Sequence, residues 1–326
     1  MSSVFIDLKL DYAFKIVFGQ EGREPSLINF LNAVLYNGRS VIKKVKILNP
    51  YMPGDVASLK DTFVDILAEV DSGDMIIIEM QMSMNPAFFK RMIYNVAKKY
   101  SGQLDTGEYY DKLSAVIGLV VANFTYPQAE QIARPITQYA LLETTDHILY
   151  PDSQDFQIAI VELPKFQKAL EQVDDHSDMW LFMLNHADGL VEVPAKMAQV
   201  KAIQMAFEAA RRVNLQASEL DELEKRRMYA LEAEASLALT REDALEEGIG
   251  IGREQGIGIG REQGIGIGRE QGIRIGREEG QVRTRQMILQ MLELGLPLEQ
   301  IAQIAEMRIA DVQQIEQELY NGRSES

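Results

Sequence analysis

Acidic and amide side chains interrupt two apolar segments of the sequence between residues 63 and 83. Asp65 lies in the first segment, and Glu79 and Gln81 lie in the second. A buried charge is costly unless an opposite charge or a ligand compensates it. Two neighbouring carboxylates repel each other unless a cation lies between them, and oxygen ligands of this kind suit Mg²⁺ or Mn²⁺. Because such an ion can activate water and neutralise charge on a phosphate, these residues are candidates for phosphodiester hydrolysis.

The turn between the two segments decides whether these side chains meet. Residues 71–73 (Asp-Ser-Gly) suit a three-residue hairpin loop whose glycine takes the left-handed conformation. This loop places Asp65 opposite Glu79, and Gln81 joins them because residues two apart on a strand point the same way. A two-residue turn would place Asp65 opposite Met80 on the other face. As an alternative without catalysis, the acids could lie at a solvated edge or pair with a lysine.

Apolar residues at helical and strand spacing predict the elements around this hairpin. Two helices are expected within residues 9–36, and a mixed apolar and basic helix within residues 85–104. The apolar, β-branched run 113–124 predicts a strand buried on both faces, and the runs 136–150 and 156–163 extend the sheet. Strands and helices therefore alternate, which predicts an α/β domain over this part of the chain.

Beyond this domain, residues 1–163, the sequence predicts three helical parts. Residues 164–247 have a helical composition, residues 248–280 repeat the unit GIGIGREQ, and residues 281–326 resemble a helix-turn-helix. In a helix, glycine at every fourth position of the repeat would allow close contact with another helix, whereas in a linker it would favour flexibility. We favour a paired helix. The tail carries few cations for a phosphate backbone, so we expect it to dimerise or dock. Together these parts predict a homo-oligomer.

Composition and charge exclude several classes of protein. The 326 residues include no cysteine, which excludes disulfides, thiolate catalysis and cysteine-based zinc sites. No run of about 18 apolar residues and no signal sequence occur, so we expect no membrane partner and a cytoplasmic location. The formal net charge of −16 arises mainly from residues 126–247, so the N-terminal part can still carry a basic groove for nucleic acid.

An ordered series of motifs carries a family resemblance. They are DLKLDYAFKIVFG, LINFLNAVL, VDILAE with IIIEMQ, FFKRMIYNVAKKYSGQLDTGEYYDKL, LSAVIGLVVANF, ELPKF and MWLFML. The series resembles the recombination-promoting nuclease family of bacteria, transposase-like members of the PD-(D/E)XK nuclease superfamily. The resemblance implies a restriction-endonuclease-like mixed sheet flanked by helices and a magnesium-dependent DNA endonuclease. It also implies a role in recombination or in DNA cleavage connected with mobile elements.

The resemblance also assigns roles to single residues. Asp65 and Glu79 match the superfamily's two metal-binding acids, and Gln81 occupies the position of its lysine. Glutamine can orient a water molecule or a phosphate, but it cannot stabilise a hydroxide as an ammonium group would. Lys15 or Lys90 could supply the missing cation.

The helix after the hairpin offers further donors, namely Lys90, Arg91, Tyr94, Lys98 and Lys99. We predict DNA contacts for Lys90 and Arg91, with a solvated helix face as the alternative. For Tyr94, Lys98 and Lys99 we prefer the solvated helix face without a DNA contact. For the nearby acids Asp11 and Glu69 we also prefer a structural role. The prediction is a Mg²⁺-dependent DNA endonuclease; the alternatives are a nuclease-like DNA-binding module without cleavage and an oligomerising scaffold.

Overall fold

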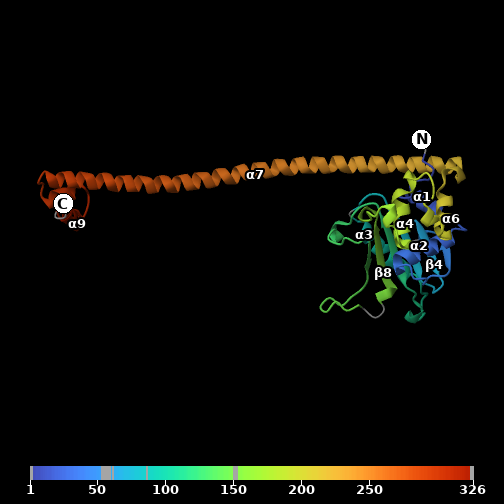
Figure 1. Ribbon diagram of the computed structural model, residues 1–326. Coiled ribbons are helices and arrows are strands. Elements are labelled where there is room, and N and C mark those ends of the chain that lie inside the picture. Colours follow the sequence, from blue (N-terminus) through green and yellow to red (C-terminus); the bar gives the residue numbers. More distant parts are fainter. Residues whose placement is uncertain (1–2, 53–59, 61, 86, 150–152, 324–326) are drawn as a thin grey trace. The chain divides into compact units, whose positions relative to one another are not determined.

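Figure 1 shows the computed structural model, which describes all residues except 1–2, 53–59, 61, 86, 150–152 and 324–326. The chain divides into two compact units, Met1–Ala238 and Leu239–Ser326. The helices are α1 (Asp11–Phe18), α2 (Glu24–Tyr36), α3 (Phe88–Ser101), α4 (His176–His186), α5 (Ala195–Ala198), α6 (Lys201–Ala210), α7 (Ala217–Glu293), α8 (Leu298–Ile304) and α9 (Ile309–Arg323). The strands are β1 (Val45–Leu48), β2 (Tyr51–Met52), β3 (Thr62–Phe63), β4 (Ile66–Val70), β5 (Met75–Gln81), β6 (Val116–Ala122), β7 (Ile136–Tyr139) and β8 (Phe156–Glu162).

A mixed sheet of six strands, ordered β1-β4-β5-β6-β8-β7, forms the centre of the first unit. Its strands β5, β6 and β8 are parallel, while β1, β4 and β7 pair antiparallel with their neighbours. Every residue of β6 is buried, which confirms the prediction of a strand covered on both faces. This sheet with helices on its faces is the fold class that the sequence predicts.

The hairpin of β4 and β5 has the predicted loop and register. Ile66 lies opposite Ile78, so the ladder runs toward a pairing of residues 65 and 79. Gly73 has a φ of 89°, and its backbone N–H donates to the carbonyl of Val70 at 2.9 Å. Only glycine adopts such a conformation without strain, so the sequence of the turn fixes the register of the whole hairpin.

The run 136–150 forms less strand than its alternating pattern predicts. Only β7 is regular, and the chain then turns back on itself through an isolated bridge between Leu142 and Leu149. The Glu143 carboxylate accepts the backbone N–H groups of Thr145 and Asp146 at 2.7 and 2.6 Å. These side-chain hydrogen bonds stabilise a local turn in place of a continued ladder. Residue 150 lies outside the described residues.

Two hydrophobic cores lie on opposite faces of the sheet. Helices α1, α2, α4 and α6 cover one face (Figure 1), where the fully buried Trp180 contacts Phe18 and Phe30. Helix α3 covers the other face. It lies so close to β6 that a Cβ at Gly118 would be 2.6 Å from the sulfur of Met92. The glycine therefore permits the close approach that brings α3 to the end of β5.

The helical interpretation of the repeat is confirmed, because α7 includes residues 248–280 without interruption. The isoleucines of the repeat are exposed; Ile249 and Ile257, for example, are 63% and 62% exposed. A partner helix for them stays a prediction.

In the second unit, α8 and α9 pack on the end of α7 around Ile288, Ile301 and Val312. Helix α7 ends just before Gly295 and Pro297, and a second break at residues 305–308 separates α8 from α9. Among the residues that the structure describes, no helix is long and apolar enough to cross a membrane.

Candidate active site

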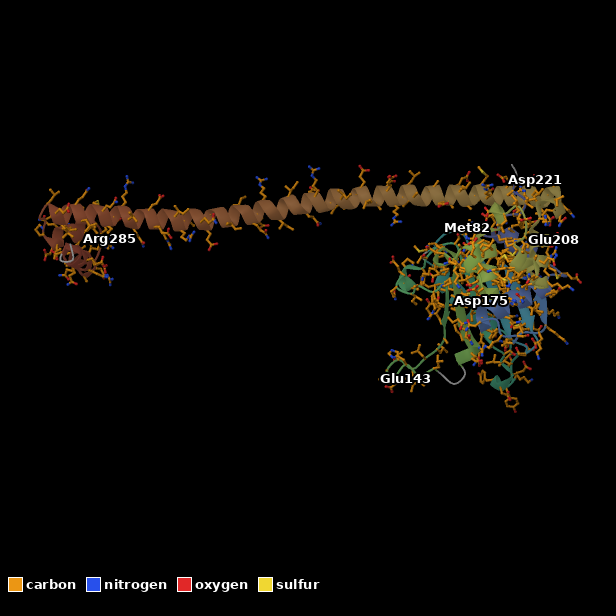
Figure 2. The ribbon with its side chains drawn as sticks, viewed as in Figure 1. Met82, Glu143, Asp175, Glu208, Asp221 and Arg285 are labelled. Carbon is orange, nitrogen blue, oxygen red and sulfur yellow. The ribbon has the colours of Figure 1, made fainter. Side chains whose placement is uncertain are left out.

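Asp65, Glu79 and Gln81 come together at the end of the sheet where β4 begins and β5 ends. Met82, which follows β5 directly, is labelled in Figure 2. Asp65 lies in a bend just before β4, and its Oδ2 accepts the backbone N–H of Met80 at 2.7 Å. The Nε2 of Gln81 donates to Oε2 of Glu79 at 3.3 Å. The hairpin thus gathers the polar groups that the sequence singled out.

Both carboxyl groups are held in an environment that disfavours their charge. Glu79 is only 7% exposed, and its burial, followed by the charge of Asp65, raises its pKa to about 7. Burial likewise raises the pKa of Asp65, and the neighbouring charge of Asp11 adds to this effect. Cations oppose these shifts, because Arg91 and Lys15 lower the pKa of Glu79. The pair is therefore a site where an additional positive charge would be strongly favoured.

Lys15 is the lysine that the fold brings to these acids. It projects from α1, and its Nζ lies 2.9 Å from Oδ1 of Asp65. Its charge lowers the pKa values of both Asp65 and Glu79, so it acts on the two carboxylates together. Lys90, the other lysine considered from the sequence, is exposed on α3. Of the two, Lys15 is the one that contacts an acid of the site.

Arg91 approaches the acids from α3. Its Nη2 lies 3.9 Å from Oε2 of Glu79, while about half of its side chain, 47%, stays exposed. A guanidinium group that faces both a carboxylate and solvent retains free N–H donors for a phosphate group.

Tyr94 and Lys98 have structural contacts instead. Lys98 is buried, and its Nζ donates to the carbonyl oxygens of Met52 and Lys60 at 2.8 and 2.6 Å. The hydroxyl of Tyr94 accepts the backbone N–H of Lys60 at 3.1 Å. Both residues therefore anchor the chain around β2 and β3 to α3. The burial of Lys98 corrects the solvated helix face that we preferred for it from the sequence.

The nearby acids Asp11 and Glu69 differ in their distance from the site. Oδ2 of Asp11 forms an ion pair with Nη1 of Arg226 at 2.9 Å, although its charge still reaches Asp65. Glu69 lies within β4 opposite Lys46 of β1, away from the end of the strand that carries the acids. A structural role fits both.

The donor set suits a hard divalent cation. Within the described parts of the chain, no group of three or more His, Cys, Asp or Glu side chains is arranged to hold a metal. Asp65 and Glu79 alone offer two carboxylates. Mg²⁺ is usually bound by one or two carboxylates, with water and substrate phosphates completing its coordination. A site with two carboxylates therefore fits this ion.

Asn95, a buried polar residue on α3, lines the same small pocket as Glu79 and Gln81. No feature of the sequence singles it out, because a single asparagine in an amphipathic helix has no distinctive spacing. Only the packing of α3 on the sheet brings it to the acids.

A family model described as PD-(D/E)XK nuclease family transposase matches residues 8–239. The matched range includes the whole sheet, both acids, Lys15 and Arg91, and it ends within α7 before the repeat. The comparisons with curated proteins and with solved structures gave no match.

Proposed function

The chain belongs to the PD-(D/E)XK nuclease family of transposases, and from this premise we propose that it is a magnesium-dependent DNA endonuclease. Nucleases of this superfamily generally use divalent metal ions. The observation that carries the proposal is the buried pair Asp65 and Glu79, with Lys15 on one side and Arg91 on the other. A role in recombination or in the movement of DNA elements follows from the family description alone.

Each residue of the site has a distinct task in this proposal. Asp65 and Glu79 hold the ion, which would activate water and neutralise charge on the scissile phosphate. Lys15 supplies the positive charge that Gln81 lacks, and Gln81 orients the attacking water or the phosphate through its amide. Arg91 binds a backbone phosphate.

Further contacts and the assembly of the chain are also proposed. Lys90 is exposed one position before Arg91 and would bind a neighbouring phosphate. The exposed isoleucines of α7 would pair with a second copy of the chain, giving a homo-oligomer in the cytoplasm.

Cleavage of supercoiled plasmid tests the nuclease. Wild-type protein should nick or linearise the plasmid with Mg²⁺ or Mn²⁺ but not with EDTA, and Asp65→Asn and Glu79→Gln should abolish cleavage. Glu69→Gln is the matched control, because Glu69 lies within β4 opposite Lys46, away from the end of the strand next to the acids. Cleavage that persists in EDTA, or that survives both substitutions, would refute the proposed site.

Gln81 favours a second candidate, a nuclease-like protein that binds DNA without cutting it, because glutamine cannot replace the charge of a lysine. This candidate predicts a well-folded wild type that retards DNA and never cleaves it, with either metal. The first candidate predicts that Asp65→Asn still binds DNA after cleavage is lost.

A further inference from the structure

Asn95 is a buried polar residue whose side chain is not satisfied by the protein around it. It is 1% exposed and lies on α3, one helical turn after Arg91. Among the residues that the structure describes, its Oδ1 has no hydrogen-bond donor. The pocket that it lines contains three other polar residues, Glu79, Gln81 and Arg91.

Packing alone does not account for an asparagine at this position. The other residues that line the pocket are apolar, namely Phe88, Met92 and Val120. A buried acceptor without a donor costs about 1–3 kcal/mol, and a leucine of similar shape would avoid that cost. Such an exception among buried polar groups calls for a functional explanation.

Gln81 lines the same pocket, and its amide can use a second acceptor. A lysine at its position would present donors only, whereas a glutamine presents an acceptor on one side of its amide and two donors on the other. Its Nε2 donates to Glu79 at 3.3 Å, and this contact engages one of its two N–H groups. With a single long hydrogen bond, the amide can rotate and exchange its oxygen and nitrogen, which would reverse its effect on a water molecule.

We propose that Asn95 is a positioning residue for Gln81 in the nuclease reaction. The structure does not contain a hydrogen bond between the two amides. In the reacting complex the Gln81 side chain turns so that its second N–H donates to Oδ1 of Asn95, and acceptors on Glu79 and Asn95 together fix the nitrogen. The Gln81 oxygen then points away from both and accepts a hydrogen bond from the attacking water. This inference rests on the proposed nuclease function, and it explains how a glutamine serves at a position where the superfamily has a lysine.

Arg91 is a poorer partner for Asn95 than Gln81 is. Its guanidinium is drawn toward Glu79, and nearly half of its side chain is exposed, where it can meet a DNA phosphate. Gln81, by contrast, comes from the last position of β5, and its backbone carbonyl accepts the N–H of Asn123 at 2.9 Å. The strand fixes the backbone of Gln81, whose side chain lines the pocket together with Asn95.

A double-mutant cycle tests the coupling between the two amides. Asn95→Leu, Gln81→Met and the double variant are compared in single-turnover cleavage of a DNA duplex at saturating Mg²⁺. Asn95→Leu should slow cleavage about tenfold or more, because the water is no longer oriented. In the Gln81→Met background the same substitution should have no further effect. Ile93→Leu, on the more exposed side of α3 and outside the pocket lining, is the control and should cleave as the wild type does.

Two further readouts separate positioning from a structural role. Asn95→Leu should unfold at the same temperature as the wild type or higher, since it removes an unsatisfied polar group. The Mg²⁺ concentration at half-maximal rate should not change, because Asp65 and Glu79 are intact.

The inference is overturned if Asn95→Leu cleaves at the wild-type rate, if it slows Gln81→Met as much as it slows the wild type, or if it unfolds at a lower temperature. A wild type that cleaves with no metal would instead refute the nuclease proposal itself, and the positioning role with it.

Discussion

Replacing Lys15 by methionine should reveal how much of the missing superfamily lysine this residue supplies. The substitution keeps the length of the side chain on α1 and removes the ammonium group that lies 2.9 Å from Oδ1 of Asp65. Two unit charges about 4 Å apart attract each other by about 4 kcal/mol at an effective dielectric constant of about 20. Because Lys15 is 39% exposed, solvent screening reduces this to about 1–2 kcal/mol.

A loss of this size in the transition state corresponds to a decrease of about 5- to 30-fold in the cleavage rate. Mg²⁺ binding should change in the opposite direction. Lys15 repels a cation from the acids, so its removal should lower the Mg²⁺ concentration needed for half-maximal rate. Single-turnover cleavage measured over a Mg²⁺ titration separates the two effects.

Two variants complete the experiment on Lys15. Lys15→Arg keeps the charge and should retain more activity than Lys15→Met. Lys46→Met removes an exposed lysine from β1, opposite Glu69, and should change neither the rate nor the Mg²⁺ titration. If Lys15→Met cleaves as fast as the wild type at every Mg²⁺ concentration, Lys15 does not replace the lysine and the assignment is wrong.

Three further predictions follow from the environment of the site. Folding raises the pKa of Glu79 from 4.5 to about 7, so the metal-free protein should lose stability as the pH rises through this interval. Glu79→Gln should reduce that loss, which thermal unfolding with EDTA at pH 5 and pH 8 measures. An equal pH dependence in both proteins would contradict the prediction. Arg91→Met should weaken DNA binding measured in Ca²⁺, and the slope of log binding constant against log salt concentration should become shallower by about one, the value for one phosphate contact. An unchanged slope would argue against a phosphate contact of Arg91. Lys98→Met should lower the free energy of unfolding by about 1–3 kcal/mol, because it leaves the carbonyl oxygen of Met52 without its buried donor. Denaturant unfolding measures this change, and an unchanged unfolding midpoint would exclude the structural role of Lys98.

Local interactions explain why much of the fold could be predicted from the sequence. The register of the β4–β5 hairpin depends on Gly73 and on the alternation of side chains along two adjacent strands, all within about twenty residues. The burial of β6 follows from its composition, and the end of α7 and the start of α8 follow from Gly295 and Pro297. In each case the residues that decide the structure are neighbours in the chain, so their pattern is visible before folding. The strand predicted beyond Tyr139 failed for a local reason as well, since the hydrogen bonds of Glu143 override the alternation.

The sequence by itself therefore determined the hairpin that brings Asp65 and Glu79 together, because a short turn and a two-residue period suffice for it. Only the tertiary structure decided which cation joins them. Helix α2 and the strands β1, β2 and β3 separate Lys15 from Asp65 in the sequence, and the packing of α1 on the sheet brings Lys15 to the acids. The same packing distinguishes residues that share one helix face: Arg91 reaches Glu79, whereas Lys98 is buried against backbone carbonyls. Both residues are basic and lie on the same face of α3, so the sequence alone does not distinguish them. The difference lies in which distant segments of the chain pack over each side chain.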